Sequence, residues 1–323
     1  MSGMKKTKDE MLRSLKIGKK DLVLEIGGGD FPFWRSDILC DRYLFDDAER
    51  AGSLVVDRPF ICADAHVLPV KDGAIDYIYC SQVLEHLERP DVFFSELMRV
   101  GKKGYLETPN EFRERLICRQ IHKWVVSDEG GVLVLRKNEL IPVFGTIFHS
   151  LMKNREFYFF YSSHYSLFNV MFEWEKEIKY RIDAPARLDR TNPSEWIESL
   201  GLSSEDIKSL ETLLLSRKTM LKTSLELFIN ALSRFISNKL KKRRRTNNKN
   251  IPELFSKILC CPGCRSDLDI QWEQKRMICD RCSRIYPVID EIPILLPDEK
   301  EVEDIERRWK DIGSKRSKRN NSG

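Results

Sequence analysis

Residues 23–30, V-L-E-I-G-G-G-D, decide the fold of this 323-residue chain. A short run that is apolar apart from Glu25 leads directly into three glycines. This order is typical of a buried parallel strand followed by a turn in which a ligand can approach the backbone, because no side chain blocks it. The stretch therefore predicts an α/β domain with a ligand site at the carboxyl end of this strand.

Further apolar runs predict the rest of a sheet. Between the runs at residues 74–80 and 104–108, residues 82–100 carry apolar side chains largely at helical spacing. Pro90 marks a helix start or a kink within them. This alternation indicates a doubly wound, Rossmann-like, mostly parallel sheet. The expected strands lie at residues 37–41, 60–64, 74–80 and 104–108.

The glycine run also restricts the ligand. A dinucleotide site needs G-x-G-x-x-G, and counting from Gly27 the position of the last glycine is taken by Pro32. Glu25, two residues before the first glycine, would repel a diphosphate. The loop therefore suits a ligand that carries a positive charge, such as an ammonium or a sulfonium group.

Residues 20–110 resemble the class I, Rossmann-like S-adenosylmethionine (SAM) methyltransferases. The resemblance rests on E-I-G-G-G, on A-D-A at residues 63–65 with the following L-P-V-K-D-G-A-I-D-Y-I, and on S-Q-V-L-E-H-L from Ser81. In that family the glycine loop contacts the methionine part of the cofactor, an acid after strand two holds the ribose, and an acid after strand three bonds the adenine amino group. The resemblance thus implies a cofactor site made of Glu25, Gly27, Gly29, Asp41, Asp64, Ala65, Ser81 and Gln82.

Two departures from the family pattern affect this assignment. The interval from Glu25 to Asp41 is short, so the first helix is expected to be brief or distorted. Asp57 is a rival to Asp41 as the ribose ligand.

A sulfonium makes its methyl carbon electrophilic, so a methyltransferase mainly aligns the acceptor and excludes water. The Asn/Asp-Pro-Pro-Tyr motif of amide and adenine-N6 methylation is absent, and Ser81-Gln82 stands in its place. O- or C-methylation is therefore expected, with no base that the sequence names. His86 is a weak candidate for a catalytic residue, and packing or capping is the alternative role for it.

Cys261, Cys264, Cys279 and Cys282 form two C-x₂-C pairs with fourteen residues between them. Two such pairs complete a tetrahedral site without an open position, which predicts structural zinc. A disulfide pair is the alternative, and Cys260 is expected to take no part.

The segment around these cysteines, residues 251–297, resembles the zinc-ribbon activator subunits of tRNA, ribosomal RNA and release-factor methyltransferases and their short bacterial relatives. In that family the ribbon stabilises or activates its methyltransferase, so the resemblance implies a scaffolding role. Glu291 departs from the pattern, because a glycine usually precedes the following I-P.

The expected organisation is a methyltransferase domain (1–182), a helical extension with a basic linker (183–250), the zinc ribbon (251–297) and a charged, flexible tail (298–323). Aromatic residues concentrated at 157–174 line an acceptor pocket or, as favoured here, pack in the core around an added strand. The basic run at residues 239–245 has three possible interpretations. It is a solvated linker, or residues 225–245 contact an anionic membrane, or the run contacts the phosphates of RNA.

Composition excludes some functional classes. The net charge of +5, from 55 Lys and Arg against 50 Asp and Glu, argues against an obligate polyanion binder. No apolar run approaches a membrane span and no signal peptide is evident. The odd count of nine cysteines argues for reduced thiols, so a cytoplasmic protein is expected.

The leading hypothesis is a SAM-dependent methyltransferase with a structural zinc ribbon that acts on a small-molecule or glycan-type acceptor, lipid-linked forms included. An RNA or translation-factor methyltransferase with a fused activator domain is the rival enzyme, although nucleic acid is the less favoured partner. A non-catalytic SAM-binding adaptor is the third alternative.

Overall fold

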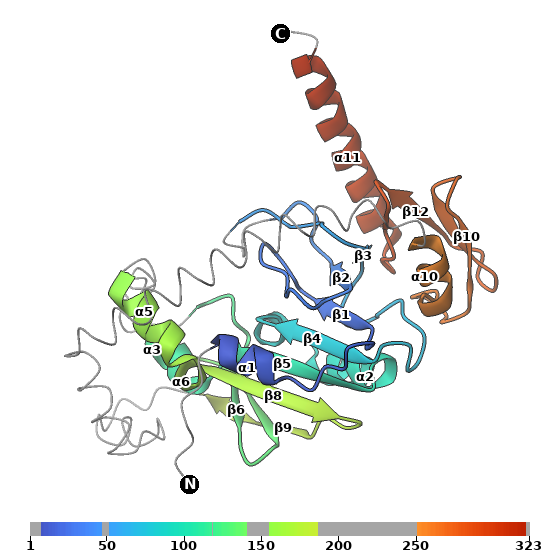
Figure 1. Ribbon diagram of the computed structural model, residues 1–323. Helices are drawn as coiled ribbons and strands as arrows, with labels where there is room; N and C mark the ends of the chain where they lie inside the picture. Colours follow the sequence, from blue (N-terminus) through green and yellow to red (C-terminus); the bar gives the residue numbers. More distant parts are fainter. Residues whose placement is uncertain (1–7, 47–51, 118, 141–154, 187–250, 321–323) are drawn as a thin grey trace, which may run out of the picture. The chain divides into compact units, whose positions relative to one another are not determined.

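The computed structural model describes residues 8–46, 52–117, 119–140, 155–186 and 251–320 (Figure 1). The chain forms two compact units. The first comprises residues 1–17, 82–88 and 105–241, and the second comprises residues 18–81, 89–104 and 242–323. The second unit therefore contains both the early strands and the C-terminal cysteine motif.

Four parallel strands form the sheet of the second unit in the order β3-β2-β1-β4. All of their residues are buried except the last residue of β2 and of β4. Burial on both faces explains why the strands read as continuous apolar runs. The expected α/β fold is confirmed. The strands are β1 (Val23–Ile26), β2 (Ile38–Asp41), β3 (Phe60–Cys62) and β4 (Tyr77–Ser81).

The helices of this sheet are few and short, in line with the sequence. Helix α2 (Pro90–Val100) begins at Pro90, because proline at the first helical position gives up a hydrogen bond that no residue there can make. Phe93 and Leu97 are among its fully buried side chains. Between β1 and β2, turns replace a helix, in line with the short interval there.

The first unit combines short helices with two groups of strands. Strand β8 lies beside β5, whose residues from Tyr105 onward belong to this unit, and a separate sheet has the order β6-β7-β9. Its elements are α1 (Lys8–Ser14), η1 (Leu84–His86), β5 (Lys103–Pro109), α3 (Glu111–Leu116), β6 (Trp124–Asp128), β7 (Leu133–Asn138), α5 (Arg155–Ser163), α6 (Tyr165–Phe168), β8 (Asn169–Glu175) and β9 (Tyr180–Ala186).

The aromatic segment of the first unit packs in the core. Tyr161, Tyr165 and Phe168 form a buried cluster, and Phe172 and Trp174 are buried on β8. Strand β8 is the added strand that the sequence indicates. This packing agrees with the core role favoured for these aromatics.

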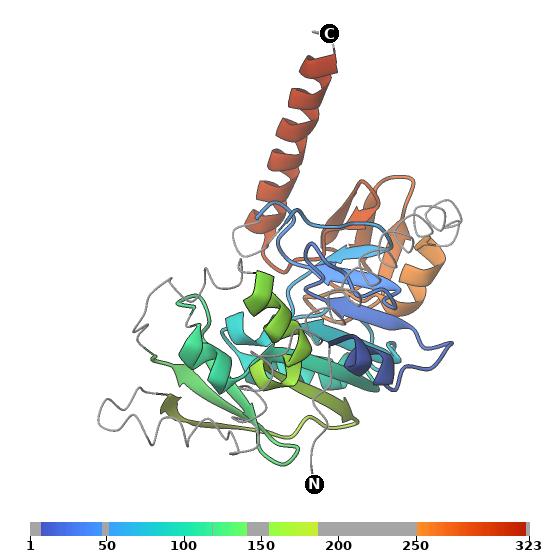
Figure 2. The same ribbon diagram turned by 60° about the vertical axis from the view of Figure 1, so that its left-hand side comes forward.

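The C-terminal part of the second unit is a small antiparallel sheet in the order β10-β11-β12-β13. Helix α10 (Ile251–Ile258) precedes it, and α11 (Glu299–Asn320) follows it. In Figures 1 and 2, α11 runs outward from this sheet as one long helix, over residues that the sequence indicates as a flexible tail. The strands are β10 (Leu268–Gln271), β11 (Arg276–Cys279), β12 (Ile285–Ile289) and β13 (Ile292–Pro293).

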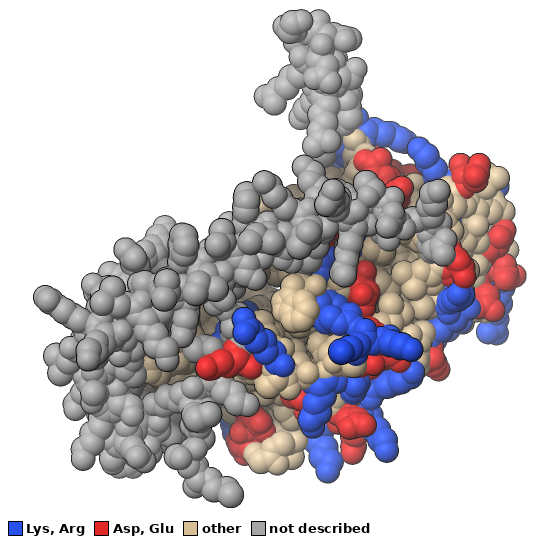
Figure 3. Space-filling model, viewed as in Figure 1, with Lys and Arg blue, Asp and Glu red and all other residues tan. Residues whose placement is uncertain are grey.

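The charged side chains of the described residues are mixed in sign. On the face drawn in Figure 3, lysines and arginines lie next to aspartates and glutamates. None of the helices within the described ranges has the length and apolar character needed to cross a membrane. The helical extension from residue 187 onward, the membrane-contact segment 225–245 and the basic run 239–245 lie outside the described residues.

Candidate functional site

The carboxyl ends of the four parallel strands bring most of the expected cofactor residues to one edge of the sheet. Because the strands are parallel and adjacent, the residues that follow them share that edge. The glycines follow β1, Asp41 ends β2, Asp64 and Ala65 follow β3, and Ser81 ends β4.

The turn after β1 needs glycine at two positions. Gly27 and Gly29 have φ angles of 74° and 53°, in the left-handed region that side chains disfavour. The Gly27 N–H donates to the Cys40 carbonyl at 2.8 Å, and the Gly29 carbonyl accepts from the Val55 N–H at 3.0 Å. These bonds fix the turn against β2 and keep its backbone bare of side chains.

The buried side chain of Glu25 also stabilises the turn after β1. Its side chain is buried, and both carboxylate oxygens accept from the Phe33 N–H, at 3.0 and 2.9 Å. A Cβ added to Gly28 would lie 3.3 Å from the Glu25 side chain, which leaves little room for any other residue. In this structure, Glu25 shapes the loop between Gly27 and Phe33.

Asp41 and Asp57, the two candidates for the ribose ligand, differ in their surroundings. Asp57 forms a double hydrogen bond with Arg58, at 2.6 and 3.0 Å, and Arg58 also donates to the Phe33 carbonyl. Asp41 ends β2, and one of its oxygens accepts from the Tyr43 N–H at 2.9 Å. Asp57 thus belongs to a structural ion pair, and Asp41 as the ribose ligand stays a prediction.

Asp64, the candidate adenine ligand, is held by cationic and polar neighbours. Its carboxylate accepts from Arg42 and from both the backbone and the ring of His66. Burial opposes the charged form, but the hydrogen bonds from His66 and the charge of Arg42 outweigh it and lower the pKa of Asp64. Arg42 also pairs with Glu301 of α11, so it links the acid after β3 to the C-terminal helix.

Gln82 is assigned to the first unit, whereas the other expected cofactor residues are assigned to the second. Its φ of 58° is strained for a residue with a side chain. Its amide oxygen accepts from Arg113 at 2.9 Å, and Arg113 also donates to Asn169 at 2.8 Å. No sequence pattern singles out Arg113 or Asn169, which come from distant segments.

His86 lies in a buried polar cluster of the first unit. Its Nε2 is 3.9 Å from Glu85 Oε1, and its ring meets that of His122 edge to face at 4.8 Å between centroids. Glu114 accepts from or donates to His122 Nδ1 at 2.6 Å. The sequence gives no signal that Glu85, Glu114 and His122 lie together, since their proximity depends on the tertiary fold.

Burial is the largest influence on the pKa values of the two carboxyl groups of this cluster, Glu85 and Glu114. It raises the pKa of Glu85 to about 8, against the hydrogen bond from Thr108 that lowers it. It also raises the pKa of Glu114 to about 8, against the opposing charge of Arg113. Both groups are therefore held largely in the neutral form near neutral pH.

The four cysteines lie close enough to share one ion. Cys261 Sγ is 3.7 Å from Cys282 Sγ, and Cys264 Sγ is 3.3 Å from Cys279 Sγ. Tetrahedral zinc with bonds of about 2.3 Å to sulfur separates its ligands by about 3.8 Å. All four sulfurs lie within 4.8 Å of one another, so the expected cysteine set can bind zinc.

Each cysteine pair is built on the same turn. The N–H of Arg265 donates to the Cys261 carbonyl at 2.8 Å, and the N–H of Ser283 donates to the Cys279 carbonyl at 3.0 Å. Arg265 and Ser283 both have positive φ, which closes each turn around its thiols. Hydrogen bonds from Ser266 lower the pKa of Cys264 to about 6 and favour the thiolate that a metal needs.

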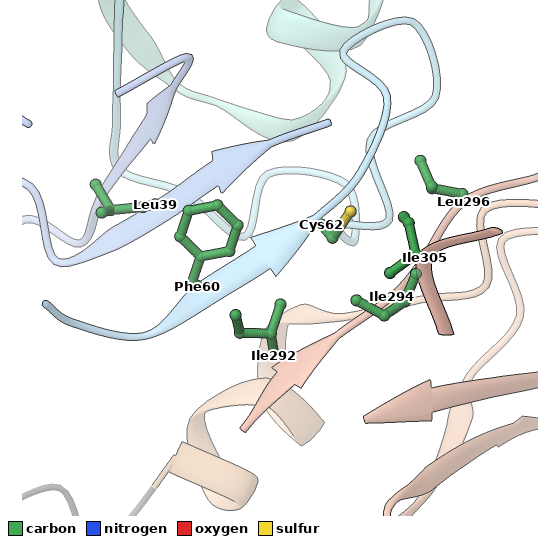
Figure 4. Close-up of a cluster of buried hydrophobic side chains, with 7 residues drawn as sticks. All are labelled: Leu39, Phe60, Cys62, Ile292, Ile294, Leu296 and Ile305. Atoms are coloured by element: carbon green, nitrogen blue, oxygen red, sulfur yellow. The ribbon is translucent and has the colours of Figure 1, made fainter. Parts of the chain in front are cut away.

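The cysteine domain packs on β3 within the second unit. Leu39, Phe60 and Cys62 meet apolar residues that follow β12, among them Ile294 (Figure 4). The Leu295 N–H donates to the Cys62 carbonyl at 2.8 Å, and Cys62 and Ile294 form a parallel bridge. The edge strand β3 is thus covered rather than left exposed.

A second set of contacts joins the two parts beside the first cysteine pair. The Lys71 N–H donates to the Ile258 carbonyl at 2.8 Å, and the Cys260 N–H donates to the Pro69 carbonyl at 3.0 Å. Arg265 pairs at 2.8 Å with Glu96, which is buried in α2. Cys260 is buried here and lies outside the four-cysteine cluster, in line with the prediction that it takes no part in the metal site.

Comparison with protein families gives two matches. Residues 43–106 match a model described as a methyltransferase domain, and residues 253–291 match a model described as Trm112p-like protein. The first covers β3, β4 and α2, and the second covers all four cysteines.

Curated relatives match the C-terminal part. A UPF0434 protein of Dechloromonas aromatica is 40% identical over 42 residues, which are 13% of this chain and 72% of that protein. A UPF0434 protein of Nitrosococcus oceani is 38% identical over 42 residues and is covered to 71%.

Solved structures share parts of the fold at low similarity. A complex of the Haloferax volcanii Trm112 methyltransferase activator with a putative methyltransferase has a TM-score of 0.34 and 14% identity, and the match covers 54% of this chain and 90% of that one. A putative methyltransferase of Bacillus halodurans has a TM-score of 0.24 and 16% identity, over 32% of this chain. The match spans half the length of that protein.

Proposed function

Because the chain belongs to the UPF0434 and Trm112p-like family through its C-terminal domain and also carries a SAM-dependent methyltransferase domain, we propose that it is a methyltransferase with its activator built into the same polypeptide. The methyltransferase domain supplies the cofactor edge and the reaction. The cysteine domain supplies a zinc-stabilised support for β3.

The observation that carries this proposal is the arrangement at the edge of the sheet. A backbone turn with positive φ at Gly27 and Gly29 lies at the same edge as Asp41 and Asp64. SAM fits these groups, because its methionine part needs access to the backbone while its ribose hydroxyls and adenine amino group need acceptors. SAM would supply the electrophilic methyl group.

The contacts within the second unit support a scaffolding role for the zinc ribbon. Ile294 and Leu295 continue the sheet beside Cys62, and the acid after β3 is linked through Arg42 to α11. Zinc at the cysteines would fix the ribbon, and the ribbon would fix the strand that precedes Asp64.

For the acceptor, the first candidate is a small molecule or a glycan-type metabolite, lipid-linked forms included. The absence of the amide-methylation motif, the modest net charge of +5 and the mixed signs in Figure 3 support it. O- or C-methylation follows from the same absence.

The second candidate acceptor is an RNA or a translation factor. The match of residues 253–291 to the Trm112p-like model supports it at least as well, because the sequence resemblance extends to activators of tRNA and release-factor methyltransferases. The basic run at residues 239–245 would supply phosphate contacts.

The reduced thiols of the zinc ribbon indicate where the protein works. Four cysteines bind zinc only as thiolates, and a reducing compartment keeps them in that form. A cytoplasmic location fits this requirement.

Titration calorimetry of SAM into the full chain tests the proposal. We expect saturable binding with one cofactor per chain. Failure to bind at high micromolar SAM would exclude a methyltransferase, and the SAM-binding adaptor as well. Binding without methylation of any cellular acceptor would favour the adaptor.

Two measurements separate the acceptor classes. Filter binding of bulk tRNA across a salt series is expected to show steep salt dependence for an RNA enzyme, and its absence would exclude that candidate. Mass spectrometry of metabolites and RNA from cells with and without the protein should reveal a species that is one methylene lighter in the cells that lack it.

A further inference from the structure

Three side chains of types that bind metals gather in the first unit, whereas the four cysteines belong to the second. Glu85 and His86 belong to η1, and His122 precedes β6. One carboxylate oxygen and one ring nitrogen from each histidine lie within 4.8 Å of one another. No residue of this group belongs to the expected cofactor set.

Backbone contacts bring the two segments together. The Lys123 N–H donates to the Glu85 carbonyl at 2.7 Å, and Trp124 Nε1 donates to the Leu87 carbonyl at 2.8 Å. These bonds anchor the start of β6 on η1. The position of His122 beside Glu85 is therefore fixed by the fold and does not depend on a mobile side chain.

Two of the three side chains are oriented by a second residue. Thr108 Oγ1 donates to Glu85 Oε2 at 2.9 Å, and Glu114 Oε1 lies 2.6 Å from His122 Nδ1. A histidine whose Nδ1 is held by a carboxylate presents its Nε2 to a ligand, which is the usual arrangement around protein-bound metals.

The other carboxylate oxygen of Glu85, Oε1, is buried without a hydrogen-bond partner among the described residues. Glu85 is 1% exposed, and among the described residues its Oε1 has no hydrogen-bond partner. The 3.9 Å between this oxygen and His86 Nε2 is too long for a hydrogen bond. A buried carboxylate oxygen left in this way is costly unless a cation or proton joins it.

We propose that Glu85, His86 and His122 bind a divalent transition-metal ion, in a second metal site separate from the zinc ribbon. Two imidazoles and one carboxylate suit zinc, iron, cobalt or manganese better than magnesium or calcium, which prefer oxygen ligands. Three protein ligands leave a position open for water or for an oxygen of a ligand.

The distances are close to those that a shared ion requires. Ligands about 2.1 Å from one ion lie at most about 4.2 Å apart. The Glu85–His86 separation of 3.9 Å satisfies this limit, and all three ligand atoms lie within 4.8 Å of one another.

Metal analysis of the full chain tests the site. We expect two equivalents of metal per wild-type chain after incubation with zinc, and one equivalent for Glu85→Gln. Glutamine retains the size of the side chain and an oxygen that accepts from Thr108, but its amide is a poor metal ligand. Glu88→Gln, the same change at an exposed position three residues later, is the matched control and should retain two equivalents.

Cobalt distinguishes the two sites by spectrum. Cobalt in the ribbon gives an intense sulfur-to-cobalt charge-transfer band, whereas the site of Glu85, His86 and His122 gives only weak d–d bands. We expect Glu85→Gln to lose the weak bands alone. Glu114→Gln removes the carboxylate behind His122 and should weaken metal binding there about 10- to 100-fold.

The possible results are decisive in either direction. One equivalent of metal in the wild-type chain, or equal metal content in wild-type and Glu85→Gln chains with native circular dichroism, would overturn the site. If Glu85→Gln loses its circular dichroism, Glu114→Gln takes its place, and unchanged affinity in that variant would overturn the site as well. Because the readout is metal content, it is independent of SAM binding and of the acceptor.

Discussion

Asp64 of the second unit and the pair Glu85 and Glu114 of the first unit are stabilised in opposite ways. In the second unit, Asp64 accepts from Arg42 and His66, and its pKa is lowered. In the first unit, Glu85 and Glu114 are buried, and their pKa values rise to about 8. Asp64 therefore depends on charged partners, whereas Glu85 and Glu114 depend on a bound proton or an incoming cation.

This difference separates what each unit can do. A carboxylate that stays ionised is suited to accept from the N–H and O–H groups of a nucleoside. A carboxyl group that is neutral near pH 7 can donate a hydrogen bond or can exchange its proton for a metal ion. The ionised carboxylate of Asp64 is thus suited to recognition, and the neutral carboxyl groups of Glu85 and Glu114 are suited to proton or metal chemistry.

Removal of zinc should have the largest effect, and it should be confined to the second unit. Structural zinc contributes about 10–16 kcal/mol in isolated zinc-finger peptides, more than a small domain can lose. We expect Cys279→Ser to abolish amide protection in residues 251–297 by hydrogen exchange, while β6 and β7 of the first unit stay protected.

The neighbouring thiol provides the control for this experiment. Cys260→Ser changes a buried cysteine that is not part of the four-cysteine cluster, so it should retain both zinc and protection. Equal loss of protection in both units after Cys279→Ser would contradict the separation drawn between them.

The pH dependence of stability is the second test, and its sign distinguishes the units. For Glu85 and Glu114 the folded pKa of about 8 exceeds the unfolded value near 4.5, so their stabilisation is complete below the unfolded value and is lost as pH rises through 8. In the chain with zinc at the ribbon alone, each group should lower the free energy of unfolding by about 1.4 kcal/mol for each pH unit between its unfolded and folded pKa values.

Urea unfolding at pH 6, 7 and 8 measures this slope, taken as the difference between the wild-type chain and the Glu85→Gln, Glu114→Gln double variant. Asp64 contributes nothing there, since its lowered pKa confines its effect to pH values below its ordinary range. A flat difference would show that both glutamates are ionised in the fold. Zinc bound by Glu85, His86 and His122 should reduce the pH slope of this stability difference, because it displaces the proton of Glu85.

Much of the second unit could be predicted from sequence because its signals are local. The run into Gly27 and each C-x₂-C pair lie within a few consecutive residues. Because the strands are buried on both faces, they appear in the sequence as continuous apolar runs. His122 and Glu114 carried no such signal, because they reach Glu85 only through the packing of β6 on η1. The role of Glu25 in holding Phe33 likewise depends on a turn that propensity does not specify.

Asp64→Ala should have a smaller and more specific effect, on cofactor affinity. If Asp64 bonds the adenine amino group, its loss should weaken SAM binding by about 1–3 kcal/mol in titration calorimetry. Arg42→Gln is the control, because it breaks the ion pair while the carboxylate remains. Unchanged affinity in Asp64→Ala would refute the adenine assignment, and equal weakening in both variants would assign the effect to the ion pair.

The smallest effect, a gain in stability, is expected at the turn between β12 and β13. Asp290 and Glu291 have φ angles of 47° and 66°, so both central residues of this two-residue hairpin turn are left-handed. Glycine adopts this conformation without the strain that a Cβ imposes, and Asp-Gly is a preferred pair for such a turn. Glu291→Gly should therefore raise the free energy of unfolding by about 0.5–1 kcal/mol.

Urea unfolding monitored by hydrogen exchange in residues 251–297 measures this gain. Asp290→Ala is the contrasting variant, because it retains the strained φ and also removes the acceptor that holds Trp309 of α11 at 3.1 Å, so it should destabilise the same segment. A loss of stability in Glu291→Gly would mean that the glutamate side chain makes a contact worth more than the strain of its backbone.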